Sequence, residues 1–309
     1  MLREFREKVG RLQNLDFQGH DRHDWLNLDM SDDEILAELR KRPDPELFLG
    51  RYTREEIKER LSSRGIFSRL VEQGYPDVEV EISTDQVYNH RLYVHTGVRD
   101  YDHILIELRL REGNFRPKKQ FIPGYVLGEM SMIMVDFLLL QNPGEKFSRD
   151  RPPLPQQTHP GLGLLKELIP LVLEVVKESG RAGVLDVPEH FHGALFYSKW
   201  FKFLDPDMEG RFRAMKRDLK KHELFVVSEC IFHDCLMNLA VGERESWSPG
   251  EQILPISEVL LDYFDHPEYK RKAGEAQEKN RYDLDVDRYQ RVKREAEEAG
   301  GPEGGVAAT

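Results

Sequence analysis

The sequence is short of the features that mark several large classes of protein. It has only two cysteines, Cys230 and Cys235, among 309 residues, which is too few for a disulfide framework and favours a reducing, cytoplasmic setting. No apolar run approaches the roughly 20 residues that cross a bilayer, and the charged start MLREFREKVGRLQ is unlike a signal peptide.

Positive charge is also scarce. The 45 Lys and Arg residues against 56 Asp and Glu residues give a formal net charge of −11. Because binding to nucleic acid depends on clustered cations that release counterions, we expect neither nucleic acid nor a membrane as a partner.

The residues that are present predict a mixed α/β fold. Alternating apolar residues predict strands at 78–82, 91–96 and 103–110, and the nearly continuous apolar run MSMIMVDFLLL (130–140) predicts a central strand. Short strands are expected at 183–187 and 202–204. Apolar residues at helical spacing predict the helices 29–40, 53–70 with an interruption near Gly65, 164–178, 188–200, about 210–241 and 256–264. This order predicts a sheet with flanking helices.

Changes in composition divide the chain into four segments. Residues 1–75 are expected to form a helical N-terminal extension, in which Ser31 with Glu34 and Thr53 with Glu56 match the capping box. Residues 76–207 form the predicted α/β core, and 208–269 a C-terminal helical region. Residues 270–309 are rich in Lys, Arg, Glu and Gly and nearly free of aliphatics, so we expect a solvated or disordered tail, either a solvated helix or disorder.

A glycine turn, THPGLG (158–163), precedes the predicted helix at 164–178. The first N–H groups of a helix have no intrahelical partner and carry partial positive charge, so they bind phosphate, and Gly161 and Gly163 would allow a close approach. The turn is neither a P-loop nor a Rossmann fingerprint, and it also fits a plain helix start. If it binds a diphosphate, the amides around Leu162 must be unoccupied by the protein itself.

Two motifs in order make residues 85–205 resemble the GNAT superfamily of N-acetyltransferases. THPGLG looks like the pyrophosphate signature Gln/Arg-x-x-Gly-x-Gly/Ala, with Thr158 in the first place. HFHGALFYSKWFKF (190–203) looks like the block Asn-x-x-Ala-x-x-x-Tyr-x-Lys, with His190 for Asn and Gly193 for Ala. Unlike the family pattern, the segment 141–157 separates the strand from the turn, and Pro160 lacks an N–H.

The resemblance implies a mixed, mainly antiparallel sheet and acetyl-CoA, or another acyl-CoA, as cosubstrate. It implies coenzyme contacts from the glycine turn, the helix start and the second motif: Thr158, Gly161, Leu162, Gly163, Leu164 and His190. Tyr197 aligns with the tyrosine that often protonates the departing thiolate; the alternative is an aromatic side chain packed on the sheet.

Two carboxylates are candidates for the base that takes a proton from the amine. Asp136 interrupts the apolar run 130–140, and burial there would raise its pKa; the alternative is a structural hydrogen bond. Glu107 lies on the predicted neighbouring strand, where alternation also fits the polar face of a half-exposed strand.

Metal-ligand patterns are weak. His190 and His192 would point about 200° apart on a helix, which does not suit one ion. Cys230, His233 and Cys235 lie in an apolar helical pattern typical of core residues. We therefore expect no metal site, although an unrelated α/β domain with a metal at His190 and His192 stays open.

The sequence leaves two main hypotheses for function. The first is an acyl-CoA-dependent N-acyltransferase that acetylates a small-molecule or peptide amine. The alternative is a non-catalytic GNAT-like protein that serves as a binding or interaction module. The acceptor and the oligomeric state stay open, with a homodimer among the options.

Overall fold

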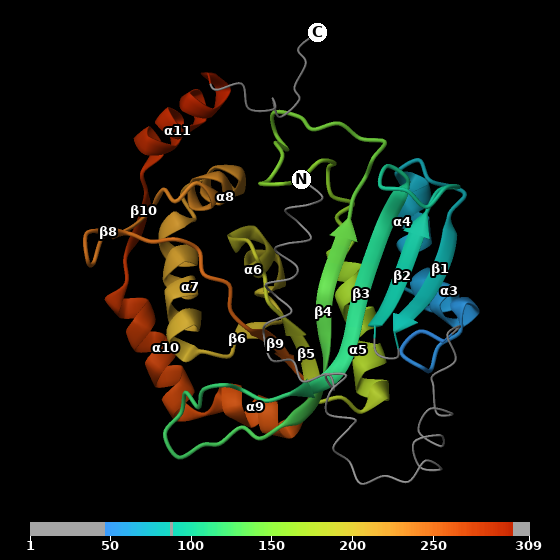
Figure 1. Ribbon diagram of the computed structural model, residues 1–309, viewed down its shortest axis with the longest axis horizontal. Helices are drawn as coiled ribbons and strands as arrows, with labels where there is room; N and C mark the ends of the chain where they lie inside the picture. The colour runs from blue at the N-terminus through green and yellow to red at the C-terminus, as the bar shows by residue number, and fades with distance from the viewer. Residues whose placement is uncertain (1–46, 87–88, 299–309) are drawn as a thin grey trace. The chain divides into compact units, whose positions relative to one another are not determined.

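A computed structural model describes residues 47–86 and 89–298 (Figure 1). The helix predicted at 29–40 therefore lies outside the described residues. None of the described helices is both long enough and apolar enough to span a bilayer.

The largest element is a seven-stranded sheet with the order β1-β2-β3-β4-β5-β9-β6. The strands β1 to β4 form an antiparallel meander, β5 joins β4 in parallel, and β6 pairs with β9 antiparallel. Their bounds are β1 Glu79–Gln86, β2 Asn89–His95, β3 Ile104–Phe115, β4 Met130–Leu140, β5 Gly183–Asp186, β6 Lys202–Phe203 and β9 Gln252–Pro255. The sheet is mixed and mainly antiparallel with flanking helices, which confirms the predicted fold class.

The chain forms two compact units, each assembled from separate segments. The first unit takes residues up to 146, 159–186 and 254–261; the second takes 147–158, 187–253 and the residues from 262 onward. The units therefore interleave along the chain, instead of dividing it at 76, 208 and 270.

In the first unit, α3 (Arg54–Ser63), α4 (Ile66–Glu72) and α5 (Leu165–Ser179) lie on one face of the strands β1 to β4 (Figure 1). The Thr53 hydroxyl accepts the Glu56 N–H at 3.2 Å, and the Glu56 carboxylate accepts the Thr53 N–H at 2.8 Å, so the predicted capping box is confirmed. The paired residues Val80 and Val94 are buried. Because side chains alternate along a strand, Glu79, Glu81 and His95 share the opposite face.

The second unit is mostly helical, with an aromatic core. The rings of Phe191, Phe203, Phe212 and Trp247 pack edge to face, with centroids 5.3–6.3 Å apart. Around them lie α6 Phe191–Tyr197, α7 Pro206–Leu219, α8 Leu224–Phe232, α10 Pro267–Lys279, α11 Val286–Glu298 and a small sheet of β7 Leu236–Asn238, β8 Glu243–Arg244 and β10 Tyr282–Leu284. The remaining helix, α9, spans Glu258–Asp265.

The long helix predicted at about 210–241 is wrong as a single element. The chain leaves α7 at Lys220 and starts α8 after Glu223, whose backbone is extended. Beyond Phe232, Asp234 has a φ of 54°, and the residues that follow pair as β7 with β8 and β10. Tertiary pairing overrides a helical pattern there.

For residues 270–298 the expected helix is present, but the expectation that this segment is only solvated is wrong, because some of its side chains are buried. These residues complete α10 and form β10 and α11. Tyr282 is 3 % exposed and belongs to the hydrophobic core with Phe212, while Tyr289 packs against Cys230 and Cys235. Tyrosines spaced among the charged residues therefore supply the apolar contacts of this segment, in which aliphatic residues are scarce.

Candidate functional site

The glycine turn extends the sheet instead of leaving all its amides open. Gln141 and Gly161 form an antiparallel bridge, the Asn142 N–H donates to the Pro160 carbonyl at 2.7 Å, and the Leu162 N–H donates to the Leu140 carbonyl at 3.3 Å. The expectation that the Leu162 amide is unoccupied is therefore wrong, because the two ends of the segment 143–159 close on each other as a short ladder.

The start of α5 is more open. Leu164 is the N-cap residue and provides no side-chain cap. Among the described residues, the N–H groups of Gly163, Leu164, Leu165 and Lys166 donate no hydrogen bond. Gly163 has a φ of 70°, and a Cβ atom there would meet nothing within 4 Å. Leu164 is fully buried, so the backbone donors that a ligand can reach are those of Gly163, Leu165 and Lys166, just after the Leu162 amide of the prediction.

The strands β4 and β5 part before β4 ends. Their pairing in the described sheet consists of Ile133 with Val184 and Met134 with Leu185, whereas β4 continues to Leu140 (Figure 1). At the same place β4 carries a bulge: Arg109 pairs with Phe137 and Leu110 with Val135, which leaves Asp136 as the extra residue. A bulge turns a side chain out of the regular alternation.

Asp136 accepts a hydrogen bond from Arg111 Nη2 at 2.9 Å, and one third of its side chain is exposed. Burial raises the pKa of this carboxyl, while the positive charges of Arg111 and Arg109 oppose the shift. The predicted candidate base therefore lies where β4 leaves β5, and it is paired with an arginine.

Glu107 is held in an ion pair. Its side chain is almost fully buried and accepts a hydrogen bond from Arg109 Nε at 2.6 Å. The Arg109 guanidinium also lies 4.8 Å above the Phe137 ring. With its charge neutralised inside the sheet, Glu107 is better explained as a structural residue than as a base.

Thr158, His190 and Tyr197 fall in the second unit, whereas Gly161 to Leu164, Asp136 and Glu107 fall in the first. His190 is the N-cap residue of α6 and stacks on His192 with ring centroids 5.2 Å apart. Tyr197 is the last residue of α6, and its ring lies 5.3 Å from that of Phe201.

Among the described residues, His190 and His192 are not part of a group of potential metal ligands. Burial and the neighbouring His190 lower the pKa of His192 to about 4. Burial raises the pKa of Cys230 to about 12, and Cys230 and Cys235 are both buried thiols. Within residues 47–86 and 89–298, a single group of three or more His, Cys, Asp or Glu ligands is found, and it lies elsewhere, on β1 and β2.

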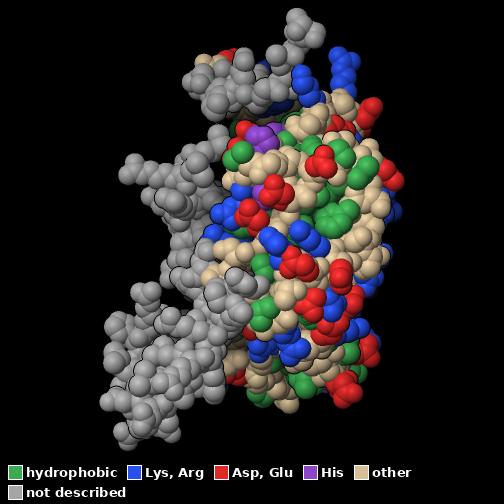
Figure 2. All heavy atoms as spheres, turned by 90° about the vertical axis from the view of Figure 1, so that its right-hand side faces the viewer, with side chains coloured by type: hydrophobic (Ala, Val, Ile, Leu, Met, Phe, Trp, Pro, Cys, Tyr) green, Lys and Arg blue, Asp and Glu red, His purple; other side chains and the backbone are tan. Residues whose placement is uncertain are grey.

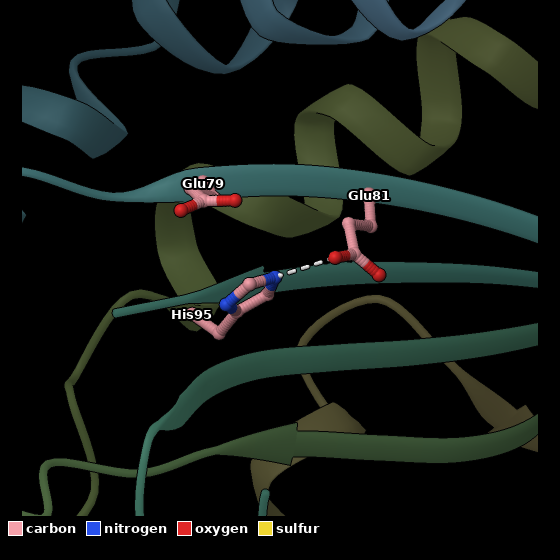
Figure 3. A group of neighbouring side chains, drawn as sticks. All are labelled: Glu79, Glu81 and His95. Atoms are coloured by element: carbon pink, nitrogen blue, oxygen red, sulfur yellow. Dashed lines mark ion pairs between the residues drawn. The ribbon is translucent and has the colours of Figure 1, made fainter. Parts of the chain in front are cut away.

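That group consists of Glu79, Glu81 and His95, which we call the β1–β2 cluster (Figure 3). One potential ligand atom from each residue lies within 4.8 Å of the others. Glu79 stands directly opposite His95 in the strand register, and Glu81 is two residues further on the same face. Sequence reasoning missed the cluster because alternation explains Glu79 and Glu81 as a polar strand face, and only the hairpin register brings His95 to them.

Glu79 also lines a hollow of about 550 Å³ in the first unit. The hollow is bounded by Lys58, Phe67, Val71, Tyr75, Pro76, Asp77, Val78, Glu79, Val80 and Gly97. Figure 2, which shows the side that lies to the right in Figure 1, has acidic and basic side chains interspersed over its described part. This face therefore presents no broad field of one charge.

Comparison with protein-family models and with curated proteins finds no match for this chain. Conclusions about its function therefore depend on the chemistry of individual residues.

Proposed function

We propose that the protein is an acyl-CoA-dependent N-acyltransferase of GNAT-like architecture, which acetylates a small-molecule or peptide amine in the cytoplasm. The observation that carries the proposal is the separation of β4 from β5 at the Asp136 bulge, next to the open start of α5. All of these elements belong to the first unit.

A parted pair of strands suits an extended ligand that carries amides. Such a ligand can pair with a strand edge in place of the missing strand, and the pantetheine arm of coenzyme A is an extended chain with two amide groups. Its diphosphate would meet the N–H groups of Gly163, Leu165 and Lys166, where the helix dipole favours negative charge. Leu162, whose amide is already paired, is no longer assigned to the diphosphate.

The reaction needs few groups. The amine nitrogen attacks the thioester carbonyl carbon, the new C–N bond forms, the C–S bond breaks and the coenzyme leaves as a thiol. We assign the uptake of the amine proton to Asp136, because its carboxylate stands out of the strand alternation at the bulge and its pKa is raised above the usual value of an aspartate. Tyr197 stays the acid for the thiolate that the family resemblance implies.

Two observations favour the alternative, a non-catalytic GNAT-like binding module. The Leu162 amide is occupied by Leu140, and Glu167 places a carboxylate in the first turn of α5, where it would repel a diphosphate. The two functions differ in whether the open amides of α5 bind coenzyme A.

The test is isothermal titration of the full chain with coenzyme A. Lys166 is exposed in the first turn of α5, so Lys166→Glu should weaken binding about tenfold through lost attraction and added repulsion. Lys177→Glu, at the exposed far end of the same helix, is the matched control and should bind like wild type.

Activity is then measured with labelled acetyl-CoA and a panel of amines. Asp136→Asn should lose transfer while retaining coenzyme A binding. No binding of coenzyme A by the wild type would refute the transferase and support the alternative module.

A further inference from the structure

We propose that the β1–β2 cluster of Glu79, Glu81 and His95 is a binding site for a divalent transition metal ion, with Zn²⁺ as the best-matched ion. The inference is independent of the acyltransferase proposal, because it uses other residues on another part of the sheet.

The first argument is the state of His95. The side chain is 1 % exposed, yet neither ring nitrogen makes a hydrogen bond among the described residues. Its Nε2 atom lies 3.2 Å from Glu81 Oε1, close enough for an ion pair although not aligned as a hydrogen bond. Leaving a buried polar atom without a hydrogen bond is unfavourable, so the two ring nitrogens, neither of them hydrogen-bonded, indicate that His95 has a ligand in this cluster.

His90, on the same strand, shows what a satisfied buried histidine looks like. It is equally buried, and its Nδ1 accepts the Leu49 N–H at 3.0 Å. Its ring also packs edge to face against Phe48. The strand thus carries one histidine whose surroundings explain it and one, His95, whose surroundings do not.

The second argument is the arrangement of the two carboxylates. Glu79 is exposed and has no ion-pair or hydrogen-bond partner among the described residues. Glu81 is oriented by Arg99, whose Nη1 lies 2.8 Å from Oε2, so that Oε1 faces His95 (Figure 3). Such an outer partner fixes the orientation of a ligating carboxylate.

The distances fit a zinc ion after a small movement of one side chain. Ligand atoms about 2.1 Å from a tetrahedral Zn²⁺ are about 3.4 Å apart, close to the 3.2 Å between His95 Nε2 and Glu81 Oε1. The Glu79 carboxylate oxygen lies within 4.8 Å of the other two ligand atoms, so its exposed side chain must move closer to them to complete the site. Three protein ligands would leave the fourth position to water.

The donor set selects the class of metal. Imidazole nitrogen suits Zn²⁺ and its neighbours in the first transition row, whereas Mg²⁺ and Ca²⁺ prefer sites made only of oxygen atoms. Two carboxylates with one imidazole therefore favour Zn²⁺ over Mg²⁺.

The test is isothermal titration of the chelator-treated full chain with zinc chloride. Glu79→Gln removes one ligand from an exposed position, so folding should be unaffected. The matched control is Glu72→Gln, an exposed glutamate on α4 outside the cluster. A second variant, Glu81→Gln, removes the carboxylate that faces His95.

We expect wild type and Glu72→Gln to bind one more Zn²⁺ ion than Glu79→Gln and Glu81→Gln, or to bind it at least about tenfold more tightly. The comparison between variants separates this site from any other histidine of the chain. Equal zinc binding by Glu79→Gln and wild type would overturn the proposal. Magnesium binding as tight as zinc binding would overturn the assignment to a transition metal.

Discussion

A close contact between two helices of the second unit gives a sharp prediction. A Cβ atom at Gly210 of α7 would strike the carbonyl of Ala273 and would lie 2.5 Å from Ala276 Cβ and 2.9 Å from the Gln277 N–H nitrogen, all on α10. Because two of these neighbours are backbone atoms, they cannot rotate away, and Gly210→Ala must push the two helices apart.

The magnitude follows from two opposing effects. Forcing an extra methyl group into a packed contact costs up to about 3 kcal/mol, and replacing glycine by alanine in a helix returns about 1 kcal/mol. We therefore expect Gly210→Ala to lower the free energy of unfolding by about 2 kcal/mol. Gly274→Ala, on α10 where a Cβ atom meets nothing within 4 Å, should raise it by up to about 1 kcal/mol.

The assay is urea unfolding of the full chain followed by tryptophan fluorescence, since Trp200 and Trp247 both lie in the second unit. The two alanine variants should move the unfolding midpoint in opposite directions. If Gly210→Ala unfolded at the same urea concentration as wild type, or at a higher one, the close approach of α7 and α10 would be refuted.

Three further perturbations have expected outcomes. Burial lowers the pKa of His90 from 6.5 to about 4, so as the pH falls His90 takes up a proton in the unfolded chain before it does so in the folded one. Protonation of the unfolded chain should therefore lower the free energy of unfolding by about 3 kcal/mol between pH 6.5 and 4. An NMR spectrum of the folded protein in which the His90 imidazole is already protonated at pH 5 would contradict this. Tyr282→Ala should lower the free energy of unfolding, measured with urea, by about 3 kcal/mol, because Tyr282 is a core residue. A loss below about 1 kcal/mol would show that Tyr282 and its segment are solvated instead of packed. Arg60→Ala removes ion pairs to Glu174 and Glu178, but Arg60 is 24 % exposed, so we expect a loss of only about 1 kcal/mol, and a thermal or urea measurement above about 2 kcal/mol would show a stronger network.

The parts of the fold that the sequence predicted are those with local signals. The bounds of the strand Met130–Leu140 match the prediction, because a long apolar run between polar segments marks a strand wherever it lies, although only Met132 to Met134 are buried. The two- and three-residue strands β7, β8 and β10 were missed, because so short a segment becomes a strand only through its partners.

In the candidate site, too, local sequence signals were readable and contacts set by strand register were not. Asp136 was visible as a single charge in an apolar run, but its bulge is a property of the register between β3 and β4. The Leu162 amide was assigned to a ligand because the ladder formed by Gln141 and Gly161 joins residues 20 positions apart. Hairpin register likewise places His95 opposite Glu79, which composition and spacing cannot show.

The first unit includes residues 254–261, so it can be completed only after these late residues have been synthesised. The N–H groups of Ile256 and Ser257 donate to the Ala182 carbonyl at 3.0 and 2.8 Å, and a Cβ atom at Gly183 would lie 2.6 Å from the Leu254 carbonyl. On a ribosome, β5 must therefore wait for its neighbour while residues 187–253 are made, roughly 3 to 13 s at ordinary elongation rates. Throughout that interval one border of the nascent sheet lacks its neighbour and exposes backbone groups that can pair with another chain.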